Sequence, residues 1–205
     1  MLTPLVGIED MRALRLTHTD ETEQLQAMRD KSLLISATGI AIESAFKYGL
    51  DLPVGAVTAT GDWINGRYFA SDRRAGYKQM HAEYMAVQDA SLDIMAPRPD
   101  TIVVTIEPCD SCQDYLSTVG SIQRVGFGLT RQEVAEMGIV KPHEETIFER
   151  AQRIGLPYEV VQIDDPFWQE VGRTIIRNVK RDPKTESLEV NDLQLDIDLH
   201  ALEQG

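Results

Sequence analysis

The sequence predicts an α/β fold, a three-layer sandwich with helices on both faces of a mixed five-stranded sheet. Three observations support this prediction. Short apolar segments typical of strands recur along the chain, between longer segments with helical periodicity. Gly61-Asp62 separates the first two strand-like segments as a hairpin turn. Residues 143–155, which have helical character, separate the last two.

The first part of the chain predicts a long helix followed by the hairpin. We expect the helix over residues 20–48, because Asp20 and Glu23 have the spacing of a capping box and apolar residues follow at helical intervals. The two hairpin strands are expected over 54–60 and 63–70.

The remaining chain alternates helices and strands. This order predicts that the fourth and fifth strands are parallel, because strands joined through a helix normally run in the same direction, whereas a tight hairpin makes them antiparallel. The expected elements, in chain order, are a loop over 71–79, a helix over 81–92, a strand over 101–107, a helix ending near Val119, a strand over 124–130, a helix over 143–155, a strand over 157–164 and a helix over 166–181.

Length and composition suit one domain with two appendages. The chain has 205 residues, 42% of them hydrophobic, which is enough for an ordinary core. We expect an N-terminal extension over 1–19, a domain over 20–182 and an acidic C-terminal tail over 183–205. Within the tail, residues 190–199 alternate apolar and acidic side chains, as in a strand that docks on a sheet edge or a partner, although such charge is also typical of disorder.

Cysteine count and charge restrict the compartment and the partners. Two cysteines give no disulfide framework, which favours a reducing cytoplasm. The N-terminus lacks the apolar run of a signal peptide, and no stretch approaches the roughly 20 apolar residues that span a membrane. The net charge of −13 opposes non-specific binding to nucleic acid. We therefore expect a cytoplasmic protein that does not associate with membranes.

Two short motifs place one histidine, two cysteines and a spare carboxylate together. They are His-Ala-Glu at 81–83 and Pro-Cys-Asp-Ser-Cys at 108–112. His81, Cys109 and Cys112 are suitable ligands for zinc, and three protein ligands leave the fourth tetrahedral position open for water, as in catalytic sites. A Cys-x-x-Cys pair alone is also found in redox pairs and in structural metal sites. The prediction of a catalytic zinc site therefore depends on the combination of the two motifs.

The spare carboxylate predicts hydrolytic chemistry at this zinc. Zinc lowers the pKa of bound water to about 7, which makes the water a nucleophile for an aromatic carbon that carries an amino group. Ammonia leaves well only when it is protonated. Glu83, which we expect not to bind the metal, would take a proton from the water and deliver it to the leaving group. Pro108 is expected in the first turn of the helix that carries both cysteines, near its positive end.

The chain resembles the cytidine deaminase-like superfamily, and within it the branch of tRNA adenosine deaminases and deoxycytidylate deaminases, in which strands four and five are parallel. The likeness to bacterial tRNA adenosine deaminases extends over about residues 53–130. It includes Pro53-Val-Gly-Ala-Val57, His81-Ala-Glu-Tyr-Met-Ala86, Thr105-Ile-Glu-Pro-Cys-Asp-Ser-Cys112 and Arg124-Val-Gly-Phe-Gly128.

This resemblance implies that domain 20–182 is a deaminase of a nucleobase with Zn²⁺ as cofactor, and that the protein is a homodimer. It implies Glu83 as the catalytic residue and a pocket shaped by the backbone around Ala82 and Cys109, with Val54 and Pro108. The favoured substrate is adenosine in tRNA or other RNA, converted to inosine. A free base, nucleoside or nucleotide of the guanine, cytosine or dCMP type is the alternative.

One departure from the family and one alternative function qualify the resemblance. The family holds the base or the ribose with an asparagine near the end of the second strand, where Ala70 stands in this chain and Asn65 lies too early. An alternative of another class is a binding protein that kept the zinc fold and lost turnover. Glu83 argues against it, because a structural zinc site does not require that residue.

Basic residues near the motifs bear on the substrate class. Arg73, Arg74 and Lys78 precede His81 and would hold a phosphate at the rim of the pocket, or they belong to a solvated loop. The last helix carries a second basic group, which would bind RNA as in tRNA-editing relatives or only complement the helix dipole. This group consists of Arg173, Arg177, Lys180 and Arg181.

Glu107 directly precedes the second motif. We expect its carboxylate to fix the loop by hydrogen bonding to the backbone, and the alternative is that it faces the substrate.

Overall fold

A mixed five-stranded sheet forms the centre of the molecule. The computed structural model describes residues 8–48, 53–61, 63–69, 81–92, 95–142, 144–177, 179–181 and 188–190. The strand order is β2-β1-β3-β4-β5. The strands are β1 (Gly55–Thr60), β2 (Trp63–Phe69), β3 (Thr101–Ile106), β4 (Arg124–Leu129) and β5 (Glu159–Gln162). Strand β1 is antiparallel to β2 and β3, whereas β4 is parallel to β3 and β5, which confirms the predicted pairing.

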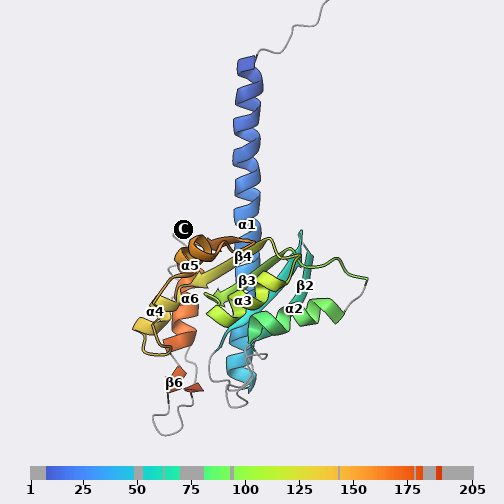
Figure 1. The fold of residues 1–205 in the computed structure, drawn as a ribbon. Helices are drawn as coiled ribbons and strands as arrows, with labels where there is room; N and C mark the ends of the chain where they lie inside the picture. The colour runs from blue at the N-terminus through green and yellow to red at the C-terminus, as the bar shows by residue number, and fades with distance from the viewer. Residues whose placement is uncertain are drawn as a thin grey trace, which may run out of the picture.

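Helices cover both faces of this sheet (Figure 1). Helices α1 (Ile8–Tyr48) and α6 (Pro166–Arg177) pack on one face, and α2 (Ala82–Leu92) and α3 (Asp110–Thr118) lie on the other. Helices α4 (Arg131–Glu136) and α5 (Ile147–Ile154) connect β4 to β5. In the part of the chain that the structure describes, no helix is both long and apolar enough to cross a membrane.

The strands alternate their side chains between two apolar layers. On β3, Ile102 and Val104 pack in the cluster that contains Ala86 of α2, whereas Val103 packs with Leu34 of α1. Successive residues of a strand point to opposite faces, so a strand covered on both faces is mostly apolar. All six residues of β3 are buried, and only Thr101 and Thr105 among them are polar. The three-layer sandwich predicted from the sequence is therefore confirmed.

Charged residues tie the first helix to the distant strands. Arg124 at the start of β4 reaches Asp30 of α1, with 2.6 Å between Nη2 and Oδ2, and also pairs with Glu159 of β5. Arg29 of α1 pairs with Asp100, with 3.1 Å between Nη2 and Oδ1. These contacts fix α1 across the amino-terminal ends of β3, β4 and β5.

Several elements differ from the expected boundaries. Helix α1 begins at Ile8 and not near Asp20, because residues 8–38 contain neither proline nor glycine to stop the helix. Part of the expected extension over 1–19 is therefore helical. Helix α4 was not expected. Helix α6 ends at Arg177, and the chain continues as β6 (Val179–Arg181), which pairs with β7 (Leu188–Val190).

Candidate metal centre

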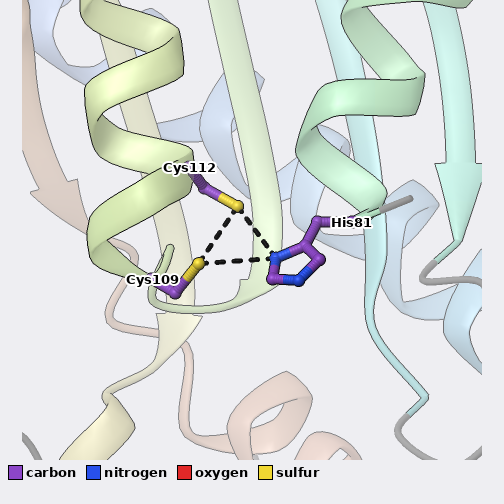
Figure 2. Close-up of side chains that lie close together, drawn as sticks. All are labelled: His81, Cys109 and Cys112. Atoms are coloured by element: carbon purple, nitrogen blue, oxygen red, sulfur yellow. Dashed lines mark hydrogen bonds between the residues drawn. The ribbon is translucent and has the colours of Figure 1, made fainter. Parts of the chain in front are cut away.

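The two motifs meet in space. His81 Nδ1 lies 3.1 Å from the Sγ of Cys112 and 3.4 Å from the Sγ of Cys109, and the two sulfur atoms are 3.2 Å apart (Figure 2). The histidine comes from the start of α2 and the cysteines from the start of α3, and all three side chains point toward one another.

Each motif lies at the amino-terminal end of a helix. The carbonyl of His81 accepts a hydrogen bond from Met85 N at 3.1 Å, and the carbonyl of Cys109 accepts one from Gln113 N at 2.9 Å, so each residue immediately precedes its helix. Cys109 is the N-cap of α3, which places Pro108 just before the cap and not in the first turn as expected. The positive end of α3 favours a thiolate at Cys109.

The three side chains fit a zinc ion. Two sulfurs and one imidazole nitrogen are the donors that zinc prefers. Ligands at tetrahedral zinc distances lie about 3.5 Å apart, so the observed edges of 3.1–3.4 Å need only a small outward movement of His81, Cys109 and Cys112. No further histidine, cysteine or carboxylate joins this cluster among the described residues, which leaves the fourth tetrahedral position without a protein ligand.

The two thiols share a proton, because their sulfur atoms are 3.2 Å apart. A hydrogen bond from Cys112, with further contributions from His81 and Ser111, outweighs burial and lowers the pKa of Cys109 to about 3. The same hydrogen bond to Cys109, together with burial, raises the pKa of Cys112. Metal binding by this pair is therefore coupled to release of the proton that the two thiols share.

Glu83 is a buried carboxyl group beside this cluster. Its exposure is 5%. Burial raises the pKa of Glu83 above its ordinary value, and the charge of Cys109 adds to the effect, while Glu83's own backbone N–H, His81 and a hydrogen bond with Cys112 oppose it. A buried carboxyl group with a raised pKa beside a candidate metal site is suited to accepting and returning a proton.

The structure adds neighbours that the motifs did not predict. Tyr84 of α2 stacks on Tyr115 of α3, with 3.7 Å between ring centroids, and this contact joins the two helices that carry the ligands. Ser111 Oγ lies 3.2 Å from Cys109 Sγ. In the sequence, the only indication of this stack is that an aromatic residue follows each motif at helical spacing.

The predicted pocket residues fall into two groups. Val54, Ala82 and Pro108 are buried, and the first two belong to one apolar cluster. Arg73, Arg74, Lys78 and Ala70 lie outside the described residues. Asn65 holds the hairpin, because it bonds to Thr58, to Thr60 and to the carbonyl of Pro97.

The basic group predicted on the last helix is divided between two elements. Arg173 pairs with Glu133 and with Glu170, and Arg177 also pairs with Glu170. Lys180 and Arg181 lie in β6 and not on α6, because the helix ends at Arg177. The continuous basic helix face expected from the sequence is therefore not formed.

The comparison with protein families finds a match over about half of the chain. Residues 28–129 match the model of the cytidine and deoxycytidylate deaminase zinc-binding region. This span contains both motifs, the three side chains of the cluster and Glu83. No curated protein matches the chain by sequence.

Solved structures share the fold. A tRNA:A34 deaminase is 17% identical with a TM-score of 0.51, and the match covers 70% of this chain and 97% of that one. The protein NE0047 in complex with 2,6-diaminopurine is 12% identical with a TM-score of 0.58, over 72% and 79% of the chains. RibD of Acinetobacter baumannii is 18% identical with a TM-score of 0.54, over 74% of this chain but 40% of that one.

Proposed function

Because the chain belongs to the cytidine deaminase-like superfamily, we propose that it hydrolyses the exocyclic amino group of a nucleobase in a zinc-dependent reaction. The observation that carries the proposal is the convergence of His81, Cys109 and Cys112 beside the buried carboxyl group of Glu83. A redox pair needs neither the histidine nor the carboxylate, and a closed structural site needs a fourth ligand.

Glu83 moves the protons of the reaction. Zinc, when bound, supplies Lewis-acid activation of water. Glu83 takes a proton as the water oxygen bonds to the ring carbon that carries the amino group. It delivers that proton to the adjacent ring nitrogen and then carries the second proton of the attacking oxygen to the amino nitrogen. The carbon–nitrogen bond breaks, and the products are ammonia and the carbonyl form of the base. Burial of Glu83 and its raised pKa support both steps, since the carboxyl group has to hold the proton between them.

For the substrate, we favour adenosine in tRNA or other RNA, converted to inosine. The resemblance of the motif segments to tRNA adenosine deaminases supports this choice, as does the fold shared with a tRNA:A34 deaminase. Arg73 and Arg74 precede the first motif and would hold RNA phosphates near the target base.

A small substrate is the second candidate, and the charges favour it. The net charge is −13, and Arg173 and Arg177 pair with glutamates. A guanine, cytosine or dCMP type of base, nucleoside or nucleotide needs no basic track. The fold shared with a protein that binds 2,6-diaminopurine is compatible with a purine of this kind.

The compartment and the assembly follow from the same proposal. Two thiolates that hold zinc require reducing conditions, which supports a cytoplasmic location. The resemblance to the tRNA adenosine deaminase branch supports a homodimer.

Ammonia release from the zinc-loaded protein tests the proposal. Adenine, guanine and cytosine compounds are compared as free bases, nucleosides, nucleotides and within RNA. Glu83→Gln should keep zinc. Its rate of ammonia release from the compound that the wild type deaminates should fall by about 10²- to 10⁴-fold or more, because the amide cannot transfer protons. Near wild-type turnover in this variant would remove Glu83 from the mechanism. A folded, zinc-loaded protein that is inactive on every compound would favour a binding protein that has lost turnover.

A further inference from the structure

Glu107 joins the cysteine motif to two helices from a later part of the chain. Its side chain is buried, with 6% exposure. Oε2 accepts a hydrogen bond from Arg131 N at 2.9 Å, and Oε1 accepts one from Ile147 N at 2.8 Å. Arg131 is the first residue of α4 and Ile147 the first residue of α5. One carboxylate therefore holds the starts of both helices, which confirms the expectation that it bonds to the backbone.

Capping alone does not explain this carboxylate. Helix α4 has its own capping box, in which Thr130 and Glu133 bond to each other's backbone, and α5 has another, formed by Thr146 and Glu149. Each box already satisfies donors at its own helix start. The starts of α4 and α5 are therefore already capped. The contacts of Glu107 add something else, a link between these helices and a distant segment of the chain.

The linked segment is the one that supplies the thiolates. Glu107 lies two residues before Cys109, and its own N–H donates to Leu129 O at 2.8 Å. Further along, Gln113 Nε2 donates to the carbonyl of Pro108 at 2.8 Å, and Tyr158 OH donates to the carbonyl of Gln113 at 3.2 Å. Residues 107–113 are thus held at both ends by hydrogen bonds.

We propose that Glu107 is a positioning residue of the zinc centre. By fixing the backbone before Cys109 against α4 and α5, it sets where both thiolates stand relative to His81. The inference rests on the proposed zinc centre and not on the identity of the substrate. Residues that orient metal ligands from outside the coordination sphere typically change metal affinity by about 10- to 100-fold when they are replaced.

Removing one backbone donor tests this inference without changing the motif. Proline is well tolerated as the first residue of a helix and lacks the N–H, and α6 already begins with Pro166. Thr130 has φ −72° and ψ 154°, a conformation that suits a residue before proline. Arg131→Pro therefore deletes the hydrogen bond to Glu107, whereas the matched Arg131→Ala removes the same side chain and keeps the N–H.

Zinc affinity, measured by competition with a chelator, is the first readout. Arg131→Pro should bind zinc about 10-fold more weakly than Arg131→Ala. Glu107→Gln should weaken zinc binding at least as much, because its amide offers one acceptor to two donors. Glu149→Gln, which alters the start of α5 without touching residues 107–112, should bind zinc as the wild type does.

Cobalt provides a readout that a purely structural role would not change. In the Co²⁺-loaded protein, the thiolate-to-metal absorption bands should shift in Arg131→Pro and Glu107→Gln, but not in Arg131→Ala. Equal zinc affinity and identical cobalt spectra for the proline and alanine variants would overturn the inference, even if Glu107→Gln failed to fold. Both measurements are independent of deamination, so a wild type that released no ammonia would refute the proposed function and leave this test valid.

Discussion

Gly55 sets how closely the first helix approaches the sheet. A Cβ at this position of β1 would lie 2.0 Å from the carbonyl oxygen of Ala37 and 2.9 Å from the nitrogen of Ala41. Both atoms belong to the backbone of α1, so neither can rotate away. Gly39, on the same helix, is exposed, and a Cβ there would have no other atom within 4 Å beyond its own stretch of helix. The two glycines therefore have opposite roles.

We expect Gly55→Ala and Gly39→Ala to change stability in opposite directions. The first overpacks the contact between β1 and α1 and should lower the free energy of unfolding by about 1–3 kcal/mol or more. The second adds a better helix former at an open position and should raise it by about 0.5–1 kcal/mol. Urea unfolding of both variants measures the difference. Equal stability of the two would show that α1 moves away from the strand at little cost.

Loss of either cysteine should remove the metal. Cys109→Ala or Cys112→Ala leaves two protein ligands, which is too few for a tight zinc site, so zinc content should fall from about one ion per chain toward zero. Ser117→Ala, which removes a hydroxyl on the same helix that bonds to Asp114 O, should keep its zinc. Metal analysis of the purified proteins decides this. A full complement of zinc in either cysteine variant would contradict the ligand assignment.

The convergence of His81, Cys109 and Cys112 was predictable because each motif is local in sequence and its chemistry is specific. The partners of Glu107 were not predictable, because its oxygens reach Arg131 and Ile147, which lie 24 and 40 residues away. A backbone N–H also leaves no signature in residue identity. The ion pair between Arg173 and Glu133 was not predictable for a similar reason, since Glu133 lies 40 residues earlier in the chain.

At the scale of elements, the strands were more predictable than the ends of the helices. Strand β3 consists of β-branched residues, four of them apolar, and could be located within one residue, because burial on both faces favours that composition. Helix α1 starts earlier than expected because Asp20 and Glu23 resemble a cap but lie within a run without helix breakers. Helix α4 has six residues, too few to show a period in the sequence.

Asp100 connects three elements, and its charge should make part of the stability depend on pH. Burial raises the pKa of Asp100, but hydrogen bonds from Thr101, Gly61 N and Arg29 outweigh it, so the pKa is lowered overall. An aspartate with a lowered pKa stabilises the fold above its unfolded pKa of about 3.9, and this contribution is lost as the pH falls through the folded value.

Asp100→Asn should therefore reduce stability at pH 7 more than at acidic pH. The urea midpoint of the variant should lie below that of the wild type at pH 7. The difference should narrow at a pH below the lowered folded pKa of Asp100, where the wild-type carboxylate is also protonated. Asp164→Asn, at an exposed position, serves as the control and should show little change at either pH. If the difference in urea midpoint between the variant and the wild type is the same at both pH values, the lower stability results from the changed shape of the side chain and not from its charge.

For the whole molecule, the distribution of charge separates the two substrate classes. If the substrate is RNA, Arg73→Ala together with Arg74→Ala should flatten the log–log dependence of affinity on salt, by about 0.7 for each phosphate that is no longer neutralised. Arg177→Ala should change this slope little, because Arg177 already pairs with Glu170. Binding of labelled RNA at several salt concentrations measures the slope. Turnover of a free base that is insensitive to salt, with no RNA binding at low salt, would exclude the RNA substrate.

The ion pair between Arg124 and Asp30 can form only after both residues have been synthesised. These residues are 94 positions apart, and Asp30 is 3% exposed in the folded protein. At a translation rate of about 5–20 residues per second, Arg124 follows Asp30 out of the ribosome by roughly 5 to 20 seconds. During that interval β1 and then β3 are made, and both cover the apolar side of α1 that carries Leu33 and Leu34. The part of this surface that lies against Gly128 of β4, next to Leu34, is covered only when β4 has also been made.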